Sequence, residues 1–250
     1  MARPLRLLTD RTGDPALDTA VARALLRRVA SGELGETFRL TVPGRIVAFG
    51  RQDTVRPGYP DAVAAAASLG FAPIERLAGG RAAVFHEGTL AFSWAIPDPR
   101  PAAGIHDRFQ ELADLMVDAF GRLGVDARIG EVPGEYCPGA YSVSVEGRRK
   151  VMGVGQRLAR TAAHVGGVVV ATGAGLVNRA IAPVYDALGY EWRPDATGAL
   201  EDAVPVDLGD VVAAIIDTLE DRYEVVATTT DAGTLDMADA LAEDHVARSR

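Results

Sequence analysis

The sequence predicts an α+β fold, a single domain in which a mixed, largely antiparallel sheet is flanked by helices. Strand-like and helical segments mix along the chain without a strict β–α–β alternation. The 250 residues are 48% hydrophobic, which is enough for a sizeable core. The proline-rich stretch from Pro97 to Gly104 is too short to separate two cores. We therefore expect one domain over residues 1–250, with a core at about 5–225 and a helical tail at about 230–250.

Helical and strand-like patterns follow one another in the first half of the chain. Apolar residues recur at helical spacing over Asp14–Val29, where Asp14-Pro15 is a start signal and Gly32 a stop signal. Two alternating strands come next, and Pro43-Gly44 between them is typical of a hairpin turn. The elements expected up to residue 96 are strands Phe38–Val42 and Arg45–Phe49, a helix over Tyr59–Leu69, and strands Ala72–Glu75, Arg81–His86 and Leu90–Ile96.

The second half opens with the most regular helix of the sequence, over His106–Leu123. Tyr141–Val145 alternates with period two, which indicates a strand, and Glu146-Gly147 is a turn. The remaining elements expected are strands Lys150–Leu158 and His164–Ala171 and helices Leu176–Leu188, Leu208–Tyr223 and Thr234–Val246.

Charge and cysteine content exclude several classes of protein. The 26 Lys+Arg and 34 Asp+Glu residues give a net charge of −8, which argues against nucleic acid as a partner. The single cysteine, Cys137, excludes an intramolecular disulfide and a cysteine-only metal site. The N-terminus shows no export signal, and no uncharged run reaches the roughly 18–20 residues of a membrane-spanning helix. We expect a cytoplasmic protein without a membrane partner.

A glycine pair between two strand patterns is the first candidate site. Gly79 and Gly80 leave no side chain to hold off a ligand, so exposed N–H groups there can receive a carboxylate, a thioester carbonyl or a phosphate. Arg76 and Arg81 flank the pair and can add charge-assisted hydrogen bonds. The alternative is a tight turn with two surface arginines. His86, at the end of the next strand, is either a general base or a structural histidine.

The lone cysteine before a basic hairpin is the second candidate site. Cys137 lies in a Pro/Gly loop, and Lys150 lies on the returning strand in the most basic stretch of the chain. A thiol near cationic groups ionises below its free pKa of roughly 8.5 and becomes a nucleophile. The alternatives are an inert buried thiol and a solvated strand lysine. His106 and His164 have no partner at ligand spacing, so we expect no metal site.

Both stretches resemble the lipoate and biotin protein ligase/transferase superfamily. The first is Arg-x-x-Gly-Gly-x-Ala-x-x-x-His, from Arg76 to His86. The second is Gly-Arg-Arg-Lys-Val-x-Gly-x-x-Gln-Arg, from Gly147 to Arg157. With the flanking elements, the resemblance covers most of residues 5–225 and implies a biotin/lipoate ligase-like catalytic domain.

The resemblance also implies roles for single residues. Lys150 would polarise the acyl carbonyl, with Gly153, Gly155 and Gln156 as the floor beside it. The other implied substrate-binding residues would line the acyl pocket or position its loop: Arg76, Gly79, Gly80, Arg81 and His86.

Within the superfamily, the sequence looks most similar to the octanoyltransferase and lipoyl-amidotransferase branch of the lipoate-protein ligase A family. ATP-dependent ligases resemble a Gly-Gly-Gly-Ala-Val-x-His-Asp-x-Gly-Asn pattern. Here Arg81 replaces the third glycine, and no such asparagine follows His86. The similar branch uses a cysteine loop before the lysine hairpin, and Cys137 lies in that loop.

The hypothesis is an acyltransferase of protein lipoylation that transfers an octanoyl or lipoyl group through a Cys137 acyl-enzyme. The acyl group is then a substrate, and no cofactor is bound permanently. One alternative is a lipoate-protein ligase that uses ATP and Mg to form lipoyl-adenylate. Another is a non-catalytic relative that binds lipoyl groups.

The resemblance implies two kinds of protein partner. The acceptors are lipoyl domains, of the glycine cleavage H protein or of 2-oxoacid dehydrogenase acyltransferase subunits, and the donor is an acyl carrier protein or a domain that carries a lipoyl amide. Both tend to be acidic, so a basic surface is expected to receive them, formed by Arg148, Arg149, Arg157 and Arg160.

Overall fold

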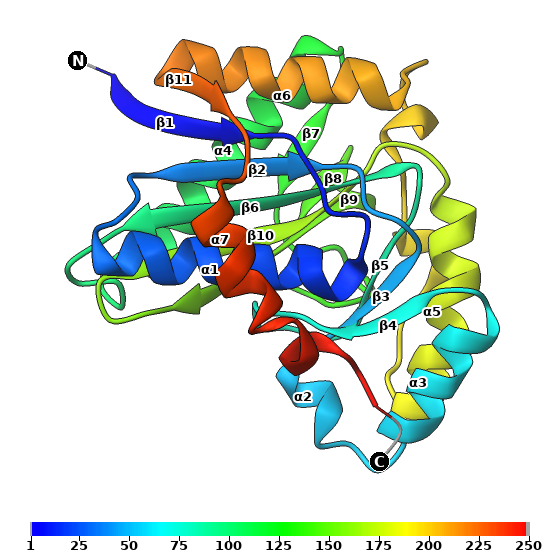
Figure 1. The fold of residues 1–250 in the computed structure, drawn as a ribbon. Coiled ribbons are helices and arrows are strands. Elements are labelled where there is room, and N and C mark those ends of the chain that lie inside the picture. Colours follow the sequence, from blue (N-terminus) through cyan, green and yellow to red (C-terminus); the bar gives the residue numbers. More distant parts are fainter. Residues whose placement is uncertain (1, 249–250) are drawn as a thin grey trace.

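Two sheets and seven α-helices make up the computed structural model, which describes residues 2–248 (Figure 1). The large sheet has the strand order β11-β1-β2-β6-β10-β9-β8-β7. Its strands are β1 Arg3–Leu8, β2 Thr37–Thr41, β6 Thr89–Pro97, β7 Ala127–Ile129, β8 Val143–Val145, β9 Arg149–Leu158, β10 Ala162–Val170 and β11 Tyr223–Thr228. Only β1 pairs in parallel, with β11 and β2, and every other pair is antiparallel.

A small sheet stands beside the large one, with the order β4-β3-β5. It comprises β3 Ile46–Phe49, β4 Ala72–Glu75 and β5 Ala83–Phe85. The α-helices are α1 Pro15–Ser31, α2 Arg51–Thr54, α3 Tyr59–Ser68, α4 Ile105–Arg122, α5 Ala174–Leu188, α6 Leu208–Arg222 and α7 Ala232–Asp239. The predicted α+β class with a mixed, largely antiparallel sheet is confirmed.

The helices divide between the sheet faces (Figure 1). Helices α4 and α6 cover one face of the large sheet in a bulky apolar core. Helix α1 lies on the opposite face with α7 packed on it. Helices α3 and α5 cover the outer face of the small sheet. The inner face of the small sheet and the α1 face of the large sheet therefore look toward one another, and the site lies between them.

The predicted hairpin at Pro43-Gly44 is wrong. Strand β2 pairs with β1 and β6 in the large sheet, whereas β3 pairs with β4 and β5 in the small sheet. Pro43-Gly44 thus connects a strand of the large sheet to a strand of the small sheet. A turn dipeptide changes the direction of the chain but does not determine which strand pairs with which. One predicted sheet becomes two for the same reason.

Several element ends also differ from the prediction. The strand predicted from Arg81 begins at Ala83, because the Arg81 N–H faces the Cys137 thiol instead of a neighbouring strand. The helix predicted over Thr234–Val246 is α7 followed by a short 3₁₀ turn at Ala242–His245. Strands β1, β7 and β11 were not predicted. The ends of the predicted domain and tail fall on residues 1 and 249–250, which lie outside the described residues.

No helix within residues 2–248 combines the length and the apolar character that crossing a bilayer requires.

Candidate active site

The Cys137 thiol faces the Gly79–Gly80 turn. Cys137 lies in the loop between β7 and β8 with φ at 44°, a left-handed conformation that its surroundings must hold. Its backbone N–H donates to the Tyr185 hydroxyl at 2.8 Å, and that hydroxyl donates to the carbonyl oxygen of Ala82 at 3.1 Å. Its Sγ accepts from the backbone N–H of Arg81 at 3.2 Å and from Nη2 of Arg76 at 3.4 Å. Two predicted motifs far apart in sequence therefore meet at one sulfur atom.

The surroundings favour the ionised form of this thiol. Burial raises the pKa of Cys137, but the charges of Arg76 and Lys150 and the hydrogen bonds from Arg76 and Arg81 outweigh burial. The net result is a pKa below the ordinary value of a cysteine. A larger share of the thiol is therefore thiolate at neutral pH, which is the nucleophilic form.

Lys150 holds the backbone of the cysteine loop. Its Nζ donates to the carbonyl oxygen of Cys137 at 2.6 Å, to the preceding carbonyl at 3.0 Å, and to Oε1 of Glu135 at 3.2 Å. The Lys150 and Glu135 side chains are 1% and 0% exposed, so the pair is buried and satisfied. Ser142 and the backbone of Gly139 also donate to Glu135. An ammonium group has three N–H donors, and all three are used inside the protein.

The glycine turn is packed too tightly for side chains. A Cβ at Gly80, where φ is 102°, would lie 2.9 Å from the Cys137 Sγ. A Cβ at Gly50 would overlap the carbonyl oxygen of Gly80, and one at Gly155 would lie 2.9 Å from that of Gly79. Gly153 lies under Lys150, with Cε at 3.2 Å from its Cβ position. The glycines thus let the turn, β9 and the cysteine loop approach one another.

Two predicted substrate-binding side chains are engaged elsewhere. His86 follows β5, at the opposite end of that strand from Arg81, and its Nδ1 accepts from the backbone N–H of Gly88. Burial lowers the pKa of His86, and its buried Nε2 has no partner among the described residues. The Gln156 side chain binds Arg108 and the carbonyl oxygen of Ile105 at the start of α4.

A cavity of about 130 Å³ lies between the two sheets and α1. Its apolar walls come from the small sheet and its floor from the large one: Ile46, Ala48, Ile74, Phe85, Ala91, Ser93, His164 and Gly166. Arg76 lines the cavity and also contacts the thiol, so the cavity and the nucleophile share one side chain. The His164 Nδ1 is 3.3 Å from Ser93 Oγ, and burial lowers its pKa to about 4.

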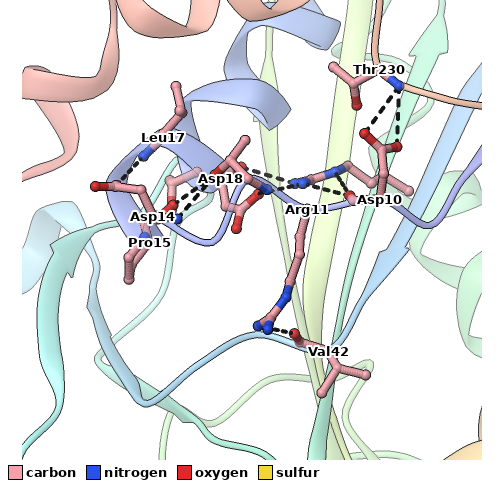
Figure 2. A network of polar contacts seen from close by, with 11 residues as sticks. Asp10, Arg11, Asp14, Pro15, Leu17, Asp18, Val42 and Thr230 are labelled. Carbon is pink, nitrogen blue, oxygen red and sulfur yellow. Dashed lines mark hydrogen bonds and ion pairs between the residues drawn. The ribbon is translucent and has the colours of Figure 1, made fainter.

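A polar network holds one wall of this cavity, as Figure 2 shows. Arg11 donates to the carbonyl oxygen of Val42 at 3.1 Å, which ties the β1–α1 loop to the end of β2. Asp10 accepts from the backbone N–H of Thr230 at 3.2 Å, and Asp14 caps α1 through the N–H of Leu17. The loop that closes the cavity is therefore fixed from three sides.

The four arginines predicted as one basic surface are split. Arg149 and Arg157 stand near opposite ends of β9, and eight residues of strand span roughly 26 Å. Arg148 and Arg149 already pair with Glu146 and Asp202, at 4.0 and 3.1 Å. Arg157 and Arg160 are exposed at the other hairpin. The predicted single basic surface is wrong because residues close in sequence move apart when the chain between them is an extended strand.

The sequence patterns did not single out Tyr185 or Ser93. Tyr185 looks like an ordinary apolar position of helix α5, and only its three-dimensional contact with Cys137 distinguishes it. Ser93 stands among small residues that alternate with bulky ones along β6, and that alternation is the available signal. In the described part of the chain, no cluster of three or more histidine, cysteine or carboxylate side chains could hold a metal ion.

Comparison with known proteins gives a consistent picture. The family model of the lipoyl protein ligase A/B catalytic domain matches residues 14–220. An octanoyl-[GcvH]:protein N-octanoyltransferase of Geobacillus kaustophilus is 30% identical over 151 residues, 60% of this chain and 51% of that protein. A lipoyl-[GcvH]:protein N-lipoyltransferase of Listeria monocytogenes is 29% identical over 156 residues, 61% of this chain and 56% of that protein. The chain thus spans about half the length of the curated relatives it matches.

The fold has solved counterparts. A bipartite lipoate protein ligase from Thermoplasma acidophilum superposes with a TM-score of 0.73 at 17% identity, covering 97% of this chain and 93% of that one. At this identity the likeness shows the fold alone.

Proposed function

The chain belongs to the lipoyl protein ligase A/B catalytic domain family, and from this premise we propose that it transfers an octanoyl or lipoyl group to a lysine of a lipoyl domain. The observation that carries the proposal is the Cys137 thiol held between Arg76 and the N–H of Arg81. The printed activities of the relatives, octanoyl and lipoyl transfer, support the same reaction class.

The proposed chemistry has two steps, and Cys137 acts in both. Its thiolate attacks the acyl carbonyl of the donor, which is a carrier-protein thioester or an acyl-lysine amide on a donor domain, and a new C–S bond forms. The donor's C–S or C–N bond breaks, and the donor leaves as a thiol or an amine after taking up a proton. The acceptor amine then attacks the acyl-enzyme carbonyl, loses a proton, and expels Cys137 as thiolate. The thioester or the exchanged amide supplies the energy, so the proposal requires neither ATP nor a permanently bound cofactor.

The residues around the thiol take separate roles. The N–H of Arg81 and the Arg76 guanidinium lie where negative charge develops near the sulfur, and such donors stabilise an oxyanion in a water-poor site. Lys150 fixes the loop through two carbonyl oxygens and adds its positive charge beside the acyl carbonyl. The acyl chain would extend past Arg76 into the apolar cavity between the sheets.

The partners and location belong to the same proposal. The donor would be an acyl carrier protein or an acylated lipoyl domain, and the relatives' names, which place the acyl group on GcvH, support the second. The acceptor would be a lipoyl domain such as the glycine cleavage H protein or a 2-oxoacid dehydrogenase subunit. We also propose a cytoplasmic location, because reducing conditions keep a lone catalytic thiol free.

Intact mass tests the proposal directly. Wild-type protein mixed with octanoyl carrier protein should gain the mass of one octanoyl group, and Cys137→Ser should not. Lys150 is the only lysine of the sequence and is buried, so few amines compete for the label. Full transfer by Cys137→Ser would remove the covalent mechanism. Transfer that requires ATP and releases pyrophosphate would favour the ligase reaction instead.

A further inference from the structure

Four arginines on or just after α2 and around the glycine turn form no ion pair within the described residues. Arg51, Arg56, Arg76 and Arg81 have no carboxylate within ion-pair distance among residues 2–248, although the whole chain carries a net charge of −8. The acidic group near them is the buried Asp53 carboxylate, whose pKa is raised by burial and lowered by the charges of Arg76 and Arg56. The guanidinium carbons of Arg56 and Arg81 lie 4.0 and 4.4 Å from the centroid of the Tyr190 ring. Four guanidinium groups against one buried carboxylate leave this region positive, and a positive region on an acidic protein attracts an acidic partner.

An exposed apolar side chain stands within this region. Val55, just after α2, is 78% exposed, the highest fraction among the exposed large hydrophobic residues of the described chain. It lies between Arg51 and Arg56 in sequence, so an apolar centre is combined with a cationic rim. We name Arg51, Val55 and Arg56 the α2 surface. A single exposed valine is ordinary by itself, and the unpaired arginines on either side give this one a distinct chemistry.

The α2 surface adjoins the nucleophile. Helix α2 begins directly after Gly50, whose Cβ position overlaps the carbonyl oxygen of Gly80. The Cβ position of Gly80 in turn lies 2.9 Å from the Cys137 Sγ. The chain of contacts from α2 to the thiol therefore passes through one backbone turn.

The charge at the thiol indicates what this surface receives. Arg76, Arg81 and Lys150 carry positive charge here, while Glu135, Asp53 and the thiolate carry negative charge. When the thiolate takes up an acyl group it becomes neutral, so the local charge rises by one and leaves a positive excess. The acceptor is a lysine, whose own ammonium group is repelled by that excess unless carboxylates surround it.

We propose that the α2 surface docks the acidic face of the lipoyl domain that carries the acceptor lysine. This inference rests on the proposed function and places docking at α2 instead of the Arg148–Arg149 end of β9. Arg148 and Arg149 on the β9 side are already paired with acidic residues. Arg51 is exposed and forms no ion pair within residues 2–248, so its charge is available to a partner. Arg56 stacks on the Tyr190 ring and donates to the carbonyl oxygen of Leu188, which holds its charge beside Val55.

The test separates docking from chemistry. Acylation of Cys137 is measured by intact mass with a small neutral octanoyl thioester, and transfer to an acidic lipoyl domain is measured as kcat and KM. Arg51→Glu and Val55→Asp should raise KM for the domain about five- to tenfold and leave acylation by the small thioester unchanged. Arg148→Glu is the matched charge reversal on the β9 side and should leave KM near the wild-type value.

Two results would overturn the inference. One is an unchanged KM in both Arg51→Glu and Val55→Asp, and the other is an equal or larger increase in Arg148→Glu. If the small thioester fails to acylate wild-type Cys137, the proposed function fails separately. Docking is then decided by titrating the lipoyl domain against wild type and Arg51→Glu, where equal affinities would contradict it.

Discussion

The two faces of the large sheet differ in the size of the side chains they present. Along β6, Leu90, Phe92, Trp94 and Ile96 alternate with Ala91, Ser93 and Ala95, and all of them sit at or near the interior. The bulky set packs with α4 and α6. The small set faces α1 and the cavity, where Gly166 of β10 and Gly155 of β9 lie beside Ser93 in register.

The contrast separates stability from function within the same strands. Alternation sends successive side chains to opposite faces, so one strand can fill a core on one side and leave space on the other. The α4/α6 face is packed with large side chains, and substitutions there should lower the free energy of unfolding. The cavity face holds glycine, alanine, serine, threonine, one histidine and the ion-paired Arg39, and substitutions there should change how the substrate binds.

The packed face should give the largest loss of stability. Phe120→Ala removes a fully buried ring of α4 and should lower the free energy of unfolding by about 3–5 kcal/mol. Urea unfolding at constant m-value measures the change. Acylation of Cys137 by a small thioester, normalised to the folded fraction, should stay near wild type. A loss under about 1 kcal/mol would mean that this face is not the stabilising one.

The cavity face should make the protein sensitive to acid through His164. Its folded pKa of about 4 lies below the usual value of about 6.5, so the unfolded state binds more protons between these two pH values. The free energy of unfolding is therefore not reduced by His164 above pH 6.5. It falls by about 3 kcal/mol in total as the pH decreases toward 4.

His164→Asn tests this by removing the titration. The fall in unfolding free energy between pH 7 and 4 should be smaller in the variant than in wild type by about that amount, whatever its stability at pH 7. Burial also lowers the pKa of His86 and His245, and these two remain as the common background. Parallel curves for the two proteins would contradict the assignment.

The sequence predicted the packed face better than the cavity face. Helical and strand periodicities located most elements, whereas the contact between Cys137 and the Gly79–Gly80 turn emerged only from the structure. Pairing between distant segments escaped prediction, because β1 and β11 come from the two ends of the chain and neither strand carries a local signal for the other. Ser93 and Tyr185 escaped for a similar reason. Periodicity tells which residues share a face and does not tell what lies opposite them.

Arg76, which lines the cavity and contacts the thiol, should control reactivity more than stability. Arg76→Met removes the main positive charge that lowers the pKa of Cys137, while burial of the thiol remains. The pH midpoint of thiol alkylation should be higher in the variant than in wild type, because the burial that raises the pKa of the thiol is then opposed by less positive charge. The pH dependence of alkylation is measured for both proteins by stopping the reaction at fixed times and determining the intact mass. Coincident profiles would show that Arg76 does not stabilise the thiolate.

The smallest change in stability should come from filling the cavity, and the same substitution can be made on both faces. Ala48 of β3 lines the cavity, and Ala119 of α4 is fully buried in the packed core. Ala48→Leu has space to occupy and should change the unfolding free energy by less than about 1 kcal/mol, whereas Ala119→Leu overpacks the core and should cost about 1–3 kcal/mol.

The two variants should rank in the opposite order when acylation is compared between a long and a short thioester. Ala48→Leu should slow acylation of Cys137 by an octanoyl thioester at least tenfold and leave acetyl transfer unchanged, because only the longer chain reaches the filled space. Ala119→Leu should treat both thioesters alike. If Ala48→Leu costs as much stability as Ala119→Leu, the cavity face is packed as tightly as the other. If it slows acetyl and octanoyl transfer equally, the chain lies elsewhere, and the small residues of β6 and β10 need another explanation.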